Sequence, residues 1–271
     1  MKKNIGTRKK IDLNSDMGES FGRYKLGFDE RIIKHITSAN VACGFHAGCP
    51  RTMRYTVRLV KQHEVALGAH PSFHDLEGFG RRAMALTMDE IKDIIVYQTG
   101  ALQAFARAEG IRLQHVKPHG ALYNMAHSVV SISAIEADEL VRSIAEAVTQ
   151  VNDELVLVMM AGSRAFRIVE EMGLRVAGEA FADRAYSADG TLVPRRMKGA
   201  VITDPSEVAV RVTKMVMENR ITAIDGAEVD LGRIDTICVH GDTPTAVELV
   251  KIVRTKLMEA GIELAPMGTF L

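Results

Sequence analysis

The sequence predicts an α/β fold, an irregular (β/α) barrel of the TIM type, and three observations support this. Short apolar runs alternate with longer amphipathic segments along the 271 residues. Such alternation gives parallel strands joined by right-handed crossovers, and about seven or eight units favour a closed barrel over an open sheet. No Pro- or Ser-rich linker divides the chain. We therefore expect one domain over residues 11–271, after a frayed, solvated basic tail at residues 1–10.

Strands are expected where short apolar runs are bounded by turn or polar residues. They lie at residues 11–14, 36–44, 65–70, 113–120, 155–162, 174–181, 200–203, 234–242 and 262–266. Helices are expected between them, at residues 51–64, 88–109, 129–150, 163–172, 206–219 and 245–260. Pro50 suits a first helical position, and Thr87 with Glu90 matches a capping box. Residues 221–231 are typical of a hairpin with an Asp-Gly turn and, like residues 187–195, form an excursion from the barrel.

Composition excludes several classes of function. Basic and acidic residues both number 34, so the formal net charge is +0. We expect no binding of nucleic acid or of an anionic membrane surface, because no broad charged surface is available. No apolar run is long enough to span a bilayer. The three cysteines lack metal-type CxxC spacing, which is typical of a reduced, cytoplasmic protein.

Polar clusters follow six of the apolar runs, namely SDMGE, FHAG, HPSFHD, PHG, ADR and HGD. The carboxyl ends of barrel strands converge on one face, where active sites normally lie. In the first cluster Asp12, Asn14 and Asp16 alternate, so their side chains share one side of the strand and point into the barrel mouth. Carboxylates held close together raise one another's pKa or bind a cation. Alternatively, Asp16 caps the turn before Gly18 and Asp12 holds the barrel floor.

Two histidines follow the second and third strands. His46, His70 and Asp16 would offer two imidazoles and a carboxylate, a three-ligand site for zinc or another divalent metal. No HExxH or CxxC signature accompanies them, so each histidine could instead be structural.

The stretch HVKPHGALYN places a lysine and a histidine on either side of a proline. Pro118 holds Lys117 extended, which makes Lys117 a fixed cation for a developing oxyanion or a phosphate. His119 could move protons near neutral pH, and Tyr123 could donate a hydrogen bond. Alternatively, Lys117 pairs with a carboxylate to hold the barrel together, since a buried unpaired lysine is costly.

Two later clusters, GEAFADR and HGD, complete the ring of polar residues. Arg184 could clamp a substrate carboxylate by bidentate hydrogen bonds, although each cluster could equally be a barrel salt bridge. Arg81 and Arg82 lie in a glycine-rich loop that could contact an anion or form a solvated turn. The expected catalytic residues are Asp12, Asp16, Lys117 and His119. The expected substrate-binding residues are Asn14, Asn40, Tyr123, Glu179, Asp183, Arg184, His240 and Asp242.

Six long motifs, in the expected order, resemble the LamB/YcsF family. They are DLNSDMGE (12–19), SANVACGFHAG (38–48), GAHPSFHDLEGFGRR (68–82), HVKPHGALYN (115–124), EAFADRAYSADGTLVPR (179–195) and CVHGD (238–242). The resemblance implies a barrel related to those of glycoside hydrolases and deacetylases. It also implies ATP-dependent opening of the 5-oxo-L-proline lactam to L-glutamate, together with the 5-oxoprolinase subunits B and C. Two positions depart from the family pattern: Cys49 replaces an acid, and Ser15 stands where a cysteine is common.

Three hypotheses of function remain open. In the first, this chain hydrolyses a lactam that the partner subunits have activated with ATP, because no GxxxxGK[ST] or GxGxxG loop occurs here; Asp12 or Asp16 would activate water. In the second, a stand-alone amide hydrolase or deacetylase uses a metal at Asp16, His46 and His70. In the third, a non-catalytic carrier delivers a small acid to its partners, which the ring of titratable groups disfavours.

Overall fold

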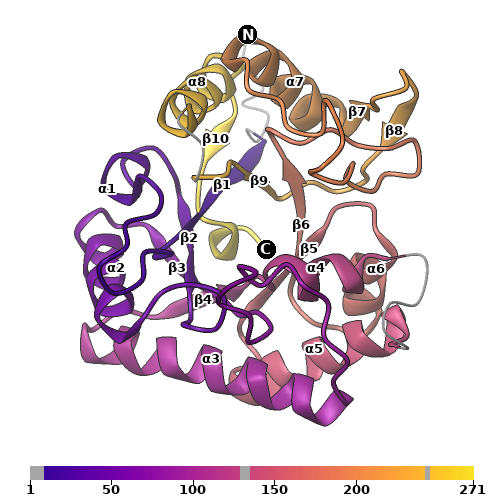
Figure 1. Cartoon of the computed structure of the whole chain (residues 1–271). Coiled ribbons are helices and arrows are strands. Elements are labelled where there is room, and N and C mark those ends of the chain that lie inside the picture. The colour runs from indigo at the N-terminus through magenta and orange to yellow at the C-terminus, as the bar shows by residue number, and fades with distance from the viewer. Residues whose placement is uncertain (1–8, 129–134, 242–244) are drawn as a thin grey trace, which may run out of the picture.

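The computed structural model describes residues 9–128, 135–241 and 245–271, and its strands surround one central axis (Figure 1). Seven parallel strands are paired in the order β1-β2-β3-β4-β5-β6-β9, and β9 pairs back onto β1, which closes the barrel. The strands are β1 (Lys10–Met17), β2 (Ser38–Ala42), β3 (Ala66–His70), β4 (Leu113–Val116), β5 (Val156–Met160), β6 (Val176–Phe181) and β9 (Thr236–Cys238). The predicted irregular (β/α) barrel is confirmed.

The helices lie outside the strands (Figure 1). They are α1 (Asp29–Ile32), α2 (Pro50–Gln62), α3 (Met88–Ala108), α4 (Gly120–Ala126), α5 (Ala137–Val151), α6 (Arg164–Glu171), α7 (Pro205–Glu218) and α8 (Ala246–Glu259). Pro50 begins α2, and the Thr87–Glu90 capping box begins α3, as predicted. The predicted hairpin is also present, as antiparallel β7 (Arg220–Thr222) and β8 (Glu228–Asp230).

One predicted barrel strand is wrong. In residues 200–203 the structure has only an isolated antiparallel bridge between Val201 and Arg184, and β6 pairs directly with β9. The segment lacks room for a strand, because Gly199 turns the chain at a positive φ and Asp204 already caps α7.

Other predicted boundaries shift as well. The strand expected at residues 113–120 ends at Val116, and α4 begins at Gly120. Residues 129–134 of the helix expected at 129–150 lie outside the described residues. Most of the predicted basic tail lies outside them too, although Lys10 already belongs to β1.

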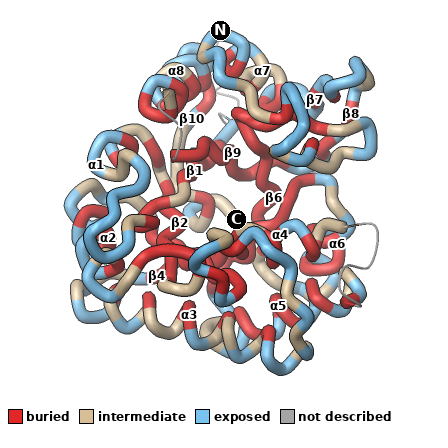
Figure 2. The backbone as a smooth tube through the Cα atoms, viewed as in Figure 1, coloured by how far each residue is buried: buried red, intermediate tan, exposed pale blue. Residues whose placement is uncertain are grey.

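The barrel strands are buried on both sides (Figure 2), with different chemistry on each. On β1, Leu13 and Met17 belong to the apolar core, whereas the alternating Asp12 and Asn14 are buried polar residues. The interior is tightly filled: a Cβ at Gly68 would lie 1.9 Å from His115 Nε2, so only glycine leaves space for this ring.

The amino-terminal end of the barrel is covered by the end of the chain. There β10 (Glu263–Leu264) pairs with the start of β1, and the 3-10 helix Met267–Thr269 follows. No helix in the described part of the chain is long and apolar enough to cross a membrane.

Candidate active site at the barrel mouth

The three polar residues of β1 lie at three depths. Asp12 pairs in register with Thr236 near the floor, and Asp16 pairs with Asn40 near the mouth. The fully buried Asp12 carboxylate accepts hydrogen bonds from three hydroxyls, those of Thr37, Ser38 and Thr236. Burial raises the pKa of Asp12 to about 6. This placement favours the floor role that was the alternative for Asp12, and it leaves Asp16 as the carboxylate that faces the mouth.

Lys117 is the central cation of the barrel. Its Nζ lies 2.8 Å from Glu179 Oε1, 3.1 Å from Asp16 Oδ1 and 3.2 Å from Cys238 Sγ. Burial alone would lower the pKa of Lys117, but the two carboxylates hold it well above its usual range. For Asp16, burial alone would raise the pKa, yet His70 and Lys117 hold it well below its usual value. Both groups are therefore ions at neutral pH, and the pairing expected of a buried lysine is present.

Two asparagines connect these charges. Asn40 Nδ2 donates to Asn14 Oδ1 at 2.7 Å and to Asp16 Oδ1 at 2.9 Å. Asn14 Nδ2 donates to Glu179 Oε1 at 3.2 Å. Both amides therefore hold the carboxylates in place. Asn14 and Asn40 were predicted to contact substrate, but their amide groups already have protein partners.

Two histidine rings at the mouth are oriented by backbone carbonyls. His70 Nδ1 lies 2.6 Å from the Lys117 carbonyl oxygen, and His119 Nε2 lies 2.9 Å from that of Phe79. A carbonyl can only accept, so each of these nitrogens carries a ring proton. The other two nitrogens, His119 Nδ1 and His70 Nε2, then face each other with lone pairs at 3.0 Å. Such an arrangement requires a shared proton or a cation to relieve the repulsion.

A third imidazole, that of His46, completes the group. It stacks on His119 with ring centroids 3.8 Å apart, and neither of its buried nitrogens has a hydrogen-bond partner among the described residues. Nitrogen atoms of His46, His70 and His119 lie within 4.8 Å of one another. Burial and the neighbouring histidines lower the pKa values of His46 and His119 well below their usual range, and neutral imidazoles are the form that binds metals.

These residues fit a divalent cation. Three imidazoles converge, and backbone carbonyls orient two of them, as outer partners orient ligands in metal sites. Asp16 Oδ2 lies 3.4 Å from His70 Nε2, but of the predicted Asp16, His46 and His70 only the two histidines belong to the converging set of imidazoles. His119, predicted as a separate proton carrier, joins that set and is neutral well below pH 7.

The late clusters have mixed outcomes. His240 Nδ1 lies 2.9 Å from both carboxylate oxygens of Asp183. Arg184 is not free to clamp a substrate, because its Nε donates to the Ala200 carbonyl at 3.2 Å and its Nη2 to that of Val193 at 2.6 Å.

Two further predicted contacts remain. Burial and the nearby Glu179 hold the pKa of Tyr123 well above its usual range, so its hydroxyl stays protonated and can donate. Asp242 lies outside the described residues.

The comparison with known families is decisive, since the LamB/YcsF family model matches residues 11–271. The chain belongs to the LamB/YcsF family. A curated relative from Pyrococcus horikoshii, named as the A subunit of 5-oxoprolinase, is 55% identical over 262 residues, which cover 97% of this chain and 99% of the relative. A relative of the same name from Clostridium beijerinckii is 50% identical over 258 residues, 95% of this chain and 98% of the relative.

A solved structure agrees with this membership. The crystal structure of a lactam utilization protein from Thermus thermophilus is 47% identical, with a TM-score of 0.86. The match covers 94% of this chain and 99% of that chain.

Sequence reasoning missed three groups in this LamB/YcsF site. His115 fills the barrel interior and lies 2.8 Å from Asn40 Oδ1; its alternation with Lys117 on one strand was the available signal. Glu19 Oε1 lies 3.8 Å from His46 Nε2, and it follows the same strand as Asp16. Cys238 contacts Lys117, and nothing in the sequence singles out this cysteine.

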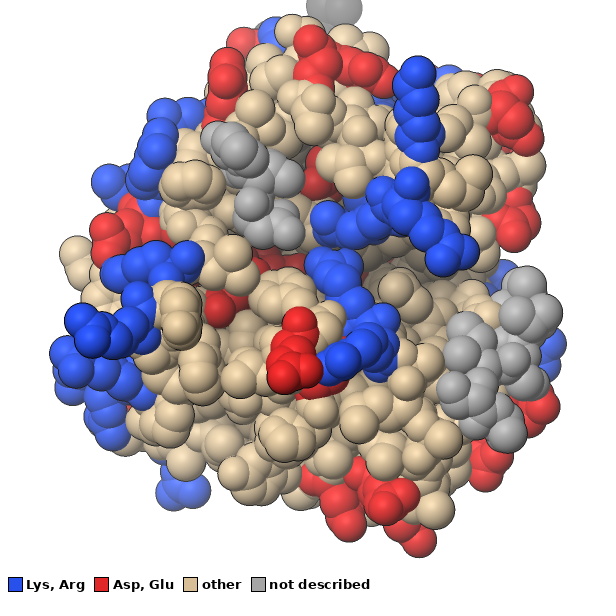
Figure 3. All heavy atoms as spheres, viewed as in Figure 1, with Lys and Arg blue, Asp and Glu red and all other residues tan. Residues whose placement is uncertain are grey.

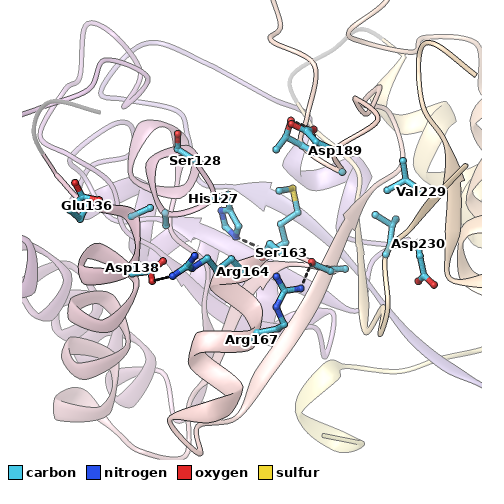
Figure 4. Close-up of a pocket in the computed structure, with 18 residues that line it drawn as sticks. His127, Ser128, Glu136, Asp138, Ser163, Arg164, Arg167, Asp189, Val229 and Asp230 are labelled. Atoms are coloured by element: carbon cyan, nitrogen blue, oxygen red, sulfur yellow. Dashed lines mark hydrogen bonds and ion pairs between the residues drawn. The ribbon is translucent and has the colours of Figure 1, made fainter. Parts of the chain in front are cut away.

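A cavity of about 510 Å³ lies outside the barrel of this LamB/YcsF chain, bordered by α4, α5, α6 and β8 (Figure 4). None of the predicted site residues lines it. Its polar contacts hold elements together: Arg164 pairs with Asp138, and His127 Nε2 accepts the Met160 N–H at 2.9 Å. This cavity therefore lacks the titratable cluster found at the mouth.

Proposed function

We propose that this chain is the hydrolytic subunit of a three-subunit, ATP-dependent 5-oxoprolinase that opens 5-oxo-L-proline to L-glutamate. The observation that carries the proposal is the Asp16–Lys117–Glu179 charge cluster beside three histidines, in a chain whose curated relatives are named as the A subunit of 5-oxoprolinase. Such preorganised charges stabilise charge that develops during a reaction. The word "subunit" in those names supports partner chains, which we take to be subunits B and C.

The chemistry explains why ATP is required. A lactam amide is a poor electrophile, and transfer of the γ-phosphoryl group to its oxygen, assigned to the partner subunits, activates the ring carbon. Water then adds to that carbon, and a proton moves to the ring nitrogen as the C–N bond breaks, which leaves γ-glutamyl phosphate. A second water releases inorganic phosphate and L-glutamate. Overall, one lactam, one ATP and two waters give L-glutamate, ADP and inorganic phosphate.

The residues at the mouth have distinct parts in this scheme. Lys117, held as an ammonium, stabilises negative charge on the oxygen of the tetrahedral carbon. The neutral imidazole of His119 accepts the proton of water through Nδ1, the nitrogen that faces His70. Asp16, held as an anion beside His70 and Lys117, orients both groups.

The test is glutamate release from 5-oxo-L-proline and ATP, in a mixture of the partner subunits with and without this chain. We expect release only when the chain is present, and loss of release with Lys117→Met but not with the matched control Lys198→Met, whose lysine is exposed. Release without the chain would overturn the proposal. Full release with Lys117→Met would favour a non-catalytic carrier instead.

The facing lone pairs of His70 and His119 favour a second candidate, a stand-alone metal-dependent amide hydrolase. His46, His70 and His119 would hold the metal, which when bound polarises an amide carbonyl and lowers the pKa of water. Equilibrium dialysis against Zn²⁺ followed by elemental analysis tests this. One zinc per chain, lost in His46→Ala and retained in the control His63→Ala at the end of α2, supports the metal. No bound metal, with activity that chelators leave unchanged, excludes it.

A further inference from the structure

A pocket of about 510 Å³ adjoins the catalytic cluster on the side of α4. Tyr123 and Asn124 line it, and four arginines surround it, namely Arg81, Arg184, Arg195 and Arg196. Tyr123 also lies beside Glu179, whose charge contributes to its raised pKa, so this side chain links the pocket to the charge cluster. Figure 3 shows Lys and Arg side chains gathered around a central hollow on this face.

Arg195 has unused hydrogen-bonding capacity. Its Nε and Nη2 are buried, and neither has a hydrogen-bond partner in the part of the chain that the structure describes. Arg184 differs, because backbone carbonyls occupy its Nε and Nη2. A buried charged donor without an acceptor destabilises the fold. An anion that supplies acceptors would therefore be stabilised here.

The positive charges of the pocket are close enough to repel one another. Burial and the charge of Arg195 lower the pKa of Arg184 to about 10, and Arg81 contributes in the same direction. The neighbouring Asp183 carboxylate pairs with His240 at 2.9 Å. A second carboxylate in the pocket, that of Asp189, accepts from the Thr191 backbone and hydroxyl. Four arginines thus border one cavity; Asp183 offsets part of the charge of Arg184 and Arg195, but both it and Asp189 already have protein partners.

We propose that this arginine pocket binds a phosphoryl group, that of the activated lactam, and that Arg195 is its principal contact. The guanidinium fork matches phosphate oxygens in bidentate geometry, and several arginines match a dianion better than the single charge of a carboxylate. The identity of the phosphoryl carrier rests on the proposed function, whereas phosphate binding by the pocket does not.

Isothermal titration of the purified chain with inorganic phosphate tests the site directly. We expect Arg195→Gln to weaken phosphate binding by at least about tenfold. The matched control Lys198→Gln removes a charge from the same loop outside the pocket and should change affinity by less than about twofold. Equal weakening in both variants, or no phosphate binding by the wild type, overturns the proposal. Thermal unfolding of each variant confirms that the fold is kept.

Two further ligands distinguish the sources of the anion. If ATP binds about a hundredfold more tightly than phosphate, and Arg195→Gln abolishes ATP binding, the pocket is a nucleotide site and the proposal is overturned. Titration with 5-oxo-L-proline tests whether the pocket binds a substrate carboxylate instead of a phosphoryl group. If Arg195→Gln weakens 5-oxo-L-proline more than phosphate, the pocket holds the substrate carboxylate and the proposal is overturned.

Turnover in the full mixture separates this proposal from the proposed function. We expect Arg195→Gln to uncouple the reaction, so that the phosphate released exceeds the glutamate formed, while Lys198→Gln keeps the two equal. If the wild-type mixture forms no glutamate but phosphate binding depends on Arg195, the proposed function fails and the phosphate site stands. If turnover and coupling are normal in Arg195→Gln, the site fails and the proposed function stands.

Discussion

The floor and the mouth of the barrel hold two carboxylates from the same strand, Asp12 and Asp16, and their electrostatics are opposite. Both lie within the barrel, yet the pKa of Asp12 is raised to about 6 whereas that of Asp16 is held well below its usual value. The hydroxyl partners of Asp12 carry no charge, so burial dominates there. Asp16 lies beside Lys117 and His70, and these two neighbours reverse the effect of burial. The comparison teaches that the partners, rather than depth alone, determine what a buried carboxylate can do.

Removal of the mouth cation should have the largest effect. Lys117→Met leaves Asp16 and Glu179 buried without their shared counter-charge, and breaking such a pair costs about 3–5 kcal/mol. We expect that loss in urea unfolding, together with a loss of glutamate release of at least about a thousandfold. The double variant Lys117→Met/Glu179→Gln should regain part of the stability but none of the activity. Full activity in the double variant would contradict the role of Lys117.

Exchange of the two carboxylates for amides should separate floor from mouth. Asp16→Asn removes the anion that holds His70 and Lys117, and we expect glutamate release to fall by about a hundredfold or more. Asp12→Asn keeps the shape of a side chain at the barrel floor. Glutamate release by this variant should stay within about threefold of wild type under conditions where both proteins are folded. Equal losses in both variants would remove the distinction between the two ends.

The pH dependence of stability should show the same contrast. The raised pKa of Asp12 means that the folded state binds its proton more tightly than the unfolded state does. Its contribution is fully present below 3.8 and is lost as pH rises through about 6. Relative to Asp12→Asn, the unfolding free energy of the wild type should therefore fall by about 2–3 kcal/mol between pH 4 and 7. Urea titrations at both pH values measure this; a constant difference would show that Asp12 does not titrate.

Much of this contrast was accessible from sequence, because period-two alternation on β1 placed Asp12, Asn14 and Asp16 on one side. The depth of each carboxylate in the barrel could not be predicted from the sequence. The register of β1 with β2 and β9 decides which carboxylate contacts hydroxyls and which lies beside Lys117. The histidine group shows the same limit. Local sequence marked His46 and His70 individually, but their meeting with His119 depends on barrel closure.

Arg184 illustrates another limit of sequence. A guanidinium group that follows a strand suggests a contact to a substrate carboxylate. In the structure, however, the loop that follows Arg184 folds back, and its Val193 and Ala200 carbonyls accept hydrogen bonds from the Arg184 guanidinium. Turn geometry over that many residues is not encoded by a local pattern. The missing strand at residues 200–203 has the same origin, because an apolar run shorter than about five residues is decided by its surroundings.

Ser15→Ala should have the smallest effect, and it sharpens the comparison because Ser15 lies between Asp12 and Asp16 on β1. Ser15 Oγ donates to the Val239 carbonyl at 2.7 Å and is fully buried, so it joins β1 to β9 rather than serving chemistry. We expect a loss of about 1 kcal/mol in urea unfolding, with glutamate release within about twofold of wild type. Ser15→Cys, which introduces a side chain of similar size, should behave similarly. A large fall in release with Ser15→Ala, at unchanged stability, would show instead that this hydroxyl acts at the mouth.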